Sequence, residues 1–123
     1  MSDLNNVVDD HLAGYGEPEP VRRAALIAGS WSEQATLVDP PFDGVGRDGI
    51  AAMTDVVLQH YPGHTFRRTT AVDTHHTFGR YGWELVGPDG AVAVSGTDFL
   101  ELDDEGKLVR IIGFFGDLAP ATA

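Results

Sequence analysis

The chain has 123 residues and a formal net charge of −11 at pH 7. This length suits one domain, and so acidic a chain is repelled by phosphate backbones and anionic lipids, so we expect neither nucleic acid nor membrane as a partner. There is no cysteine, which excludes disulfides, thiolate catalysis and cysteine-ligated metals. The acidic start lacks the apolar core of a signal peptide, and no stretch reaches the roughly 18 apolar residues of a membrane span, which predicts a cytoplasmic protein.

The first part of the chain predicts two helices. Residues 3–15 carry apolar side chains at helical spacing, with His11 on or near the apolar stripe. Two prolines then predict the start of a second helix, which runs to about Trp31. We expect Arg22 and Arg23 to stay in water on this helix. Its buried side is predicted to comprise Val21, Ala24, Ala25, Ala28 and Trp31, with Leu26 and Ile27 widening it.

The rest of the chain predicts mainly strands. A short strand over residues 35–40 ends at Pro40-Pro41, and a third helix over residues 46–61 follows. The remaining strands are predicted over residues 65–76, 78–87, 91–102 and 108–116. This order predicts an α+β domain in which three helices pack on one face of a curved, mostly antiparallel sheet. We expect residues 119–123 to form a disordered tail.

A single acid stands out in the late strands. Alternation along residues 92–102 places Asp98 on a face that is otherwise apolar or glycine. Such surroundings raise the pKa of a carboxyl group and make Asp98 a candidate proton donor near neutral pH. The alternative is a structural role, in which Asp98 bonds to Thr97 or Ser95 across a bulge at Gly96.

Two further groups are site candidates. Asp39 shares a strand face with Leu37, so it too stands beside apolar residues at the mouth of a loop. His76 shares a strand face with apolar residues and is a secondary candidate, although a rim position is the commoner role for such a histidine. The histidines do not form a set with enough metal ligands, so we expect no metal and no cofactor.

The layout as a whole resembles the nuclear transport factor 2-like (NTF2-like) superfamily, and within it the SnoaL-like and ketosteroid isomerase-like branches. The resemblance is carried by A-T-L-V-D-P, by the helix start G-R-D-G-I, and by the late hairpin G-T-D-F-L-E-L-D-D-E-G-K-L-V-R-I-I-G-F-F-G. It implies a single domain over residues 1–118, folded as a conical barrel with an apolar pocket between helices and sheet. It also implies a homodimer, which many members form.

The resemblance implies roles for individual residues. Asp39 matches the base that moves a proton between carbons in ketosteroid isomerases, and Asp98 matches their protonated oxyanion-hole acid. His11 aligns best with a first-helix tyrosine that donates to the same oxyanion, while Tyr15 lies nearby, and which of the two replaces that tyrosine stays open. The expected substrate-binding residues are Tyr15, Trp31, Phe42, Met53, Val57, Trp83 and Phe115.

Three functions follow as hypotheses. The first is a cofactor-independent isomerase or polyketide-type cyclase, acting through an enolate on a small hydrophobic carbonyl compound. The second is a non-catalytic module that binds a hydrophobic ligand or dimerises. The third is a hydrolase or dehydratase that uses His76 with Asp39 or Asp98.

Overall fold

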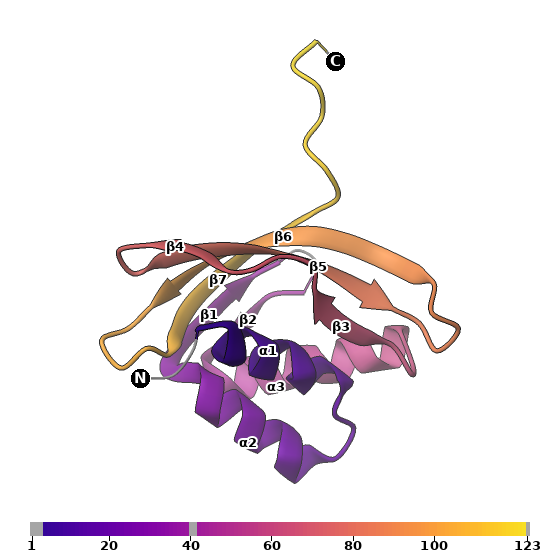
Figure 1. The fold of residues 1–123 in the computed structure, drawn as a ribbon. Helices are drawn as coiled ribbons and strands as arrows, with labels where there is room; N and C mark the ends of the chain where they lie inside the picture. Colours follow the sequence, from indigo (N-terminus) through magenta and orange to yellow (C-terminus); the bar gives the residue numbers. More distant parts are fainter. Residues whose placement is uncertain (1–3, 40–41, 123) are drawn as a thin grey trace.

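The computed structural model describes residues 4–39 and 42–122. Three helices cover the concave face of a curved, seven-stranded sheet (Figure 1). The helices are α1 (Leu4–Gly16), α2 (Pro20–Ser30) and α3 (Gly46–His60). The strands are β1 (Trp31–Val38), β2 (Gly44–Val45), β3 (Thr65–Arg68), β4 (Asp73–His75), β5 (Phe78–Val86), β6 (Val92–Leu102) and β7 (Leu108–Phe115). The predicted α+β architecture, with three helices on one face of a mostly antiparallel sheet, is confirmed.

The order of strands in the sheet is β2-β1-β7-β6-β5-β3, with β4 also pairing with β5. The β5–β6 and β6–β7 pairs are hairpins, whereas β1 runs parallel to β7. This parallel pair joins the first strand to the last, so residues that are distant in sequence lie side by side in the sheet. The segment predicted as one strand over residues 65–76 forms two, β3 and β4, on either side of an irregular stretch.

The helices lie against the concave face. Helix α1 contacts β3 and α3 contacts β1, so the two together cover the centre of that face, as Figure 1 shows. Among the described residues, no helix is long and apolar enough to cross a membrane.

The second helix differs from the prediction. Its buried residues are Arg23, Ile27 and Ser30, while Val21, at 75% exposure, lies in solvent. Arg23 is buried because its guanidinium forms an ion pair with Asp55 of α3. The inward side of α2 therefore includes a charged residue that has a partner on the facing helix.

The first strand also differs at its ends. It begins at Trp31 rather than at residue 35, since the α2 helix ends at Ser30. The two prolines predicted to end it, Pro40 and Pro41, lie outside the described residues. The loop predicted after them contains the two-residue strand β2, which pairs antiparallel with β1.

Candidate active site

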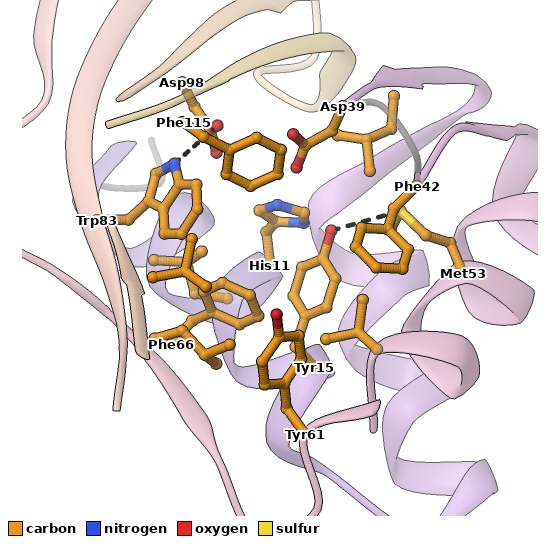
Figure 2. Close-up of a pocket in the computed structure, with 15 residues that line it drawn as sticks. His11, Tyr15, Asp39, Phe42, Met53, Tyr61, Phe66, Trp83, Asp98 and Phe115 are labelled. Carbon is orange, nitrogen blue, oxygen red and sulfur yellow. Dashed lines mark hydrogen bonds between the residues drawn. The ribbon is translucent and has the colours of Figure 1, made fainter. Parts of the chain in front are cut away.

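A cavity of about 340 Å³ lies between the concave face of the sheet and helices α1 and α3. Its wall is almost entirely apolar and aromatic, with two carboxyl groups at one end (Figure 2). Enclosed apolar cavities with a few polar groups are the usual form of small-molecule sites. The lining residues are His11, Leu12, Tyr15, Leu37, Asp39, Phe42, Met53, Val57, Tyr61, Phe66, Trp83, Leu85, Val94, Asp98 and Phe115.

The sheet register brings the two carboxyl groups together. In the parallel pair of β1 and β7, Val38 lies opposite Ile112, so the next residue, Asp39, lies beside Gly113. In the antiparallel pair Gly113 lies opposite Asp98. A side-chain carbon at Gly113 would lie 2.7 Å from Oδ1 of Asp39 and 2.9 Å from Oδ1 of Asp98. The two carboxyl oxygens therefore flank the space that glycine leaves empty.

Two donors from β5 hold Asp98. The Tyr81 hydroxyl donates to its Oδ2 at 2.6 Å, and the Trp83 indole Nε1 donates to its Oδ1 at 2.9 Å. The sequence suggested Thr97 or Ser95 as partners of Asp98 across a bulge at Gly96. Its partners are instead Tyr81 and Trp83, and there is no bulge, because Trp83 pairs in regular register with Gly96. A side-chain carbon at Gly96 would lie 2.5 Å from the Trp83 ring, so glycine is needed there to admit the indole.

Burial dominates the acidity of Asp98, which is 5% exposed. Loss of hydration is the largest effect and raises the pKa of Asp98, and the charge of Asp39 raises it further. The hydrogen bonds from Tyr81 and Trp83 lower the pKa. The net pKa is about 7. Asp98 is therefore divided between its neutral and ionised forms near neutral pH.

Asp39 has a different environment. Among the described residues no donor reaches its buried Oδ1. Its backbone N–H donates to Oδ1 of Asp43 at 2.9 Å, and its carbonyl accepts from the backbone of Phe42 at 2.7 Å, so the loop is tied back close to the residue. Burial raises the pKa of Asp39 to about 6, with the charge of Asp43 as a second cause.

Asp39 and Asp98 thus form a pair with separated acidities. Both pKa values lie above the ordinary value of 3.8, and that of Asp98 is the higher. The pKa of Asp39 is raised because its carboxyl group is partly buried and because the charge of Asp43 lies nearby. Near neutral pH, Asp39 can accept a proton while Asp98 can donate one.

Helix α1 contributes two polar groups to the opposite wall. His11 and Tyr15 are one turn apart, and their rings meet edge to face with centroids 5.3 Å apart. The Tyr15 hydroxyl makes only a weak contact with Met53 Sδ at 3.8 Å. Burial raises the pKa of Tyr15 well above its usual value, and the charges of Asp98 and Asp39 reinforce this. Tyr15 remains a neutral phenol and a hydrogen-bond donor.

His11 is also neutral. Its Nδ1 accepts a hydrogen bond from the Trp31 indole at 3.0 Å. Burial lowers the pKa of His11 to about 3. The sequence left open whether His11 or Tyr15 takes the role of the family tyrosine. Both residues line the cavity as neutral groups.

Two of the predicted site residues lie elsewhere. Trp31 is fully buried behind His11 and does not line the cavity, because its strand position turns the indole toward α1. His76 is exposed in the turn after β4, with a φ of 54°, and its ring contacts His75. The strand predicted through His76 ends at His75, so the alternation that placed His76 on an inner face does not apply.

Several contributors were not predicted as site residues. Tyr81 is opposite Asp98 in the β5–β6 hairpin, and the turn at Pro88-Asp89-Gly90 was the signal that could have placed it there. Aromatic residues of α3 and β3, Tyr61 and Phe66, also line the cavity. The remaining unpredicted lining residues are aliphatic: Leu12, Leu37, Leu85 and Val94. In the part of the chain that the structure describes, no three His, Asp or Glu side chains are grouped so as to hold a metal ion.

A scan against protein-family models and a search of curated proteins each found no match. Solved structures do resemble the chain. A SnoaL-like family protein from Agrobacterium tumefaciens strain C58, named as a candidate isomerase, is 35% identical, with 91% of this chain and 96% of that chain covered and a TM-score of 0.84.

Two more distant structures share the fold. An NTF2-like protein of unknown function from Exiguobacterium sp. 255-15 is 18% identical with a TM-score of 0.71, and 91% of this chain and 99% of that chain are covered. A candidate SnoaL-like polyketide cyclase from Jannaschia sp. CCS1 is 13% identical with a TM-score of 0.70, and 91% of this chain and 85% of that chain are covered.

Proposed function

Because the chain belongs to the SnoaL-like family of NTF2-like proteins, we propose that it is an enzyme that moves a proton through an enolate on a small hydrophobic carbonyl compound. The observation that carries this proposal is the buried Oδ1 of Asp39, which has no hydrogen-bond partner among the described residues and lies beside Asp98 in an apolar cavity. A carboxylate without donors is a stronger base than a solvated one, and an adjacent acid can stabilise the charge that develops on a ligand oxygen.

The proposed reaction gives each acid one role. Asp39 takes a proton from the carbon next to the carbonyl group, and the electron pair of that C–H bond moves into an enolate. Asp98, in its protonated form, donates a hydrogen bond to the enolate oxygen. In an isomerase, Asp39 then returns the proton to another carbon as the enolate reverts to a carbonyl group. In a cyclase, the enolate carbon attacks a second carbonyl carbon, the π bond of that carbonyl group breaks, and its oxygen takes the proton held by Asp39.

The two acidities set the pH range of this chemistry. Asp39 must be ionised, which requires a pH above its pKa of about 6, and Asp98 must be protonated, which requires a pH below its pKa of about 7. We therefore expect a bell-shaped rate profile whose two limbs belong to the coupled pair.

The size of the cavity narrows the substrate. Its volume of about 340 Å³ is at the lower end of the usual range for ligand sites. The buried part of the substrate should therefore be a compact ring system of one or two rings, with its carbonyl group directed toward the carboxyl pair.

The experiment is hydrogen exchange in deuterated water. Compact ketones such as 1-indanone are incubated with the protein, and loss of the protons next to the carbonyl group is followed by NMR. Asp39→Asn should lower the exchange rate by about a thousandfold, a typical size for loss of a general base. Asp104→Asn, which changes an exposed acid of the β6–β7 turn, is the matched control and should leave the rate unchanged.

A non-catalytic binding module is the second candidate. It is favoured by the two hydrogen bonds that already satisfy Asp98, since such bonds also suit a purely structural acid. In that case no ketone would exchange faster with the protein than without it, and 1-indanone would bind equally well to wild type and to Asp39→Asn. The hydrolase or dehydratase hypothesis is set aside because His76 lies outside the cavity.

A homodimer and a cytoplasmic location complete the proposal. The outer face of the sheet exposes large apolar side chains: Val38, Phe99, Ile112 and Phe114. Ion pairs between Arg80 and Asp73 and between Arg110 and Glu101 balance charge near them, so two copies could meet there despite the net charge of −11.

Light scattering coupled to gel filtration tests the homodimer. Wild type should have the mass of a dimer, and Phe114→Glu should have the mass of a monomer. Val21→Glu changes an equally apolar, exposed residue on α2 and should remain dimeric. A monomeric wild type would contradict the proposed dimer without affecting the proposed chemistry.

A further inference from the structure

The hydrogen bond between Trp31 and His11 fixes where the imidazole proton lies. The indole N–H can only donate, and it points at Nδ1 of His11 from 3.0 Å. Nδ1 must therefore carry a lone pair, which rules out both the Nδ1–H tautomer and the doubly protonated imidazolium in this arrangement. The proton of the neutral ring is on Nε2.

The surroundings preserve this tautomer. Trp31 is 0% exposed and His11 is 4% exposed, so water cannot compete for Nδ1. The two rings meet edge to face with centroids 5.3 Å apart, which also holds the imidazole plane in position. Burial lowers the pKa of His11 to about 3, which agrees with a ring that stays neutral at physiological pH.

The other edge of the ring has no hydrogen-bond partner among residues 4–39 and 42–122. His11 lines the cavity and Trp31 does not, so the edge that carries Nε2 is the one available to a ligand. No described residue accepts a hydrogen bond from Nε2. In Figure 2 the His11 ring reaches into the same space as the Asp39 and Asp98 carboxyl groups and the Tyr15 hydroxyl.

We infer that Trp31 is a positioning residue that locks His11 as the Nε2–H tautomer, and that this N–H donates a hydrogen bond to an oxygen of the bound ligand. The tautomer follows from the protein alone. The identity of the oxygen, the carbonyl or enolate oxygen of a compact ketone, rests on the proposed function. The histidine acts as a neutral donor and takes no proton from the substrate.

The tautomer is tested on the free protein by ¹⁵N NMR. We expect a protonated Nε2 and an unprotonated Nδ1 for His11, unchanged between about pH 5 and pH 8, and a scalar coupling across the N–H···N bond from Trp31 Nε1 to His11 Nδ1. Wild type alone decides this test. An Nδ1–H tautomer, a mixture of tautomers or titration within this range would overturn the inference.

Trp31→Phe tests the lock itself. The variant removes the donor and keeps an aromatic ring, so a folded Trp31→Phe protein should show a mixture of tautomers at His11. An unchanged His11 spectrum in this variant would show that Trp31 does not position the ring. If the variant fails to fold, the coupling measured in wild type still decides the inference.

The ligand contact is tested with 1-indanone labelled with ¹³C at its carbonyl carbon. The amide introduced by His11→Gln can accept from Trp31 and donate to the ligand, whereas the thioether introduced by His11→Met is a weak acceptor and cannot donate. We expect His11→Gln to keep the downfield carbonyl shift of the bound probe and His11→Met to lose it, with about tenfold weaker binding. An identical shift in His11→Met, or no binding to wild type, would overturn the contact.

These outcomes are separable from those of the proposed function. The tautomer is measured without a ligand and without turnover, so it stands or falls independently of proton exchange by Asp39. Conversely, Asp39 could exchange ketone protons in a protein whose His11 makes no ligand contact.

Discussion

Two carboxyl groups, that of Asp98 in the middle of β6 and that of Asp39 directly after β1, share a cavity but are held in opposite ways. Asp98 accepts hydrogen bonds from Tyr81 and Trp83, whereas the inward oxygen of Asp39 accepts none from any described residue. Burial raises the pKa of both. The strand thus presents an acid whose position is fixed, while the loop presents one whose inner oxygen is left free for chemistry.

This difference explains why one fold can place two acids side by side. Buried carboxyl groups that repel each other need either partners or a proton. The sheet supplies partners for Asp98, and the raised pKa of each group lets a proton be retained. A buried acceptor that lacks a donor costs free energy, and such costs are most often tolerated where a ligand provides the missing partner.

The largest expected effect is on stability as a function of pH. The folded pKa values exceed the ordinary 3.8, so the folded protein binds more protons than the unfolded chain. Their stabilisation is complete below about pH 3.8 and is lost as the pH rises through about 6 and 7. Each pKa unit corresponds to about 1.4 kcal/mol, and the contribution of Asp39 is reduced because solvent screens its partly exposed carboxyl group. The free energy of unfolding should therefore fall by an amount on the order of a few kcal/mol.

Denaturant unfolding at a series of pH values measures this loss. The double variant Asp39→Asn/Asp98→Asn keeps all other acids and should lose much less stability between about pH 4 and pH 8. Parallel curves for wild type and the double variant would show that neither acid is perturbed by burial.

Replacing each acid by alanine should cost a different amount of stability. At pH 5 both are mostly protonated, so the cost of burying charge is small. Asp98→Ala leaves the Tyr81 hydroxyl and the Trp83 indole without an acceptor and should cost about 2 to 4 kcal/mol. Asp39→Ala removes a side chain with no donor on its inner oxygen and should cost less than about 1 kcal/mol. Equal losses in the free energy of unfolding would contradict the comparison.

Gly113→Ala tests the empty space between the acids. The added methyl group would lie within 3 Å of both carboxyl oxygens, at 2.7 and 2.9 Å. Asp98 is held by two bonds, so Asp39 should be the one displaced, with a stability loss of about 1 to 3 kcal/mol from overpacking. The pKa of Asp98, measured by carbon-detected NMR, should then fall because Asp39 contributes to its rise.

Gly29→Ala is the matched control for this substitution. Gly29 lies in α2 with no atom within 4 Å of an added carbon, so alanine there should stabilise the helix by about 0.5 to 1 kcal/mol. A loss at Gly29 as large as that at Gly113 would mean that the effect is unrelated to the carboxyl pair.

Tyr81→Phe should have a modest effect on stability and a specific effect on acidity. The variant removes one donor from Asp98, which should cost about 1 kcal/mol and raise the pKa of Asp98 further, because the Tyr81 bond lowers it. The alkaline limb of the rate profile should move to higher pH. Tyr61→Phe removes a hydroxyl from the cavity wall without contact to Asp98 in the described structure, and it should leave that limb in place.

The sequence predicts the helices and strands better than it predicts which strands pair with one another. Alternation along β6 predicted that Asp98 lies on the inner face. Alternation along the first strand placed Asp39 on the same face as Leu37. Both acids line the cavity. The parallel pairing of β1 with β7 was not predicted, because nothing in either strand specifies a partner more than 70 residues away. That pairing is what brings Asp39 to Gly113.

Side-chain partners explain the remaining differences. Arg23 was expected in water, yet it is buried against Asp55, and no pattern within α2 indicates an acid on another helix. Trp31 was expected in the cavity wall, yet its indole turns to His11. His76 was expected on a strand face, yet the strand ends one residue earlier. Each error concerns a contact between distant segments or the last residue of an element.

The position of β7 between β1 and β6 has a consequence for biosynthesis. Until Leu108–Phe115 has left the ribosome, the sheet consists of two separate pieces, and Asp39 has no Gly113 or Asp98 beside it. Helices and local hairpins can form earlier, whereas contacts between distant segments form slowly. The cavity should therefore be among the last parts of the nascent chain to mature, and a chain stopped before β7 should expose the unpaired backbone edges of β1 and β6 to chaperones.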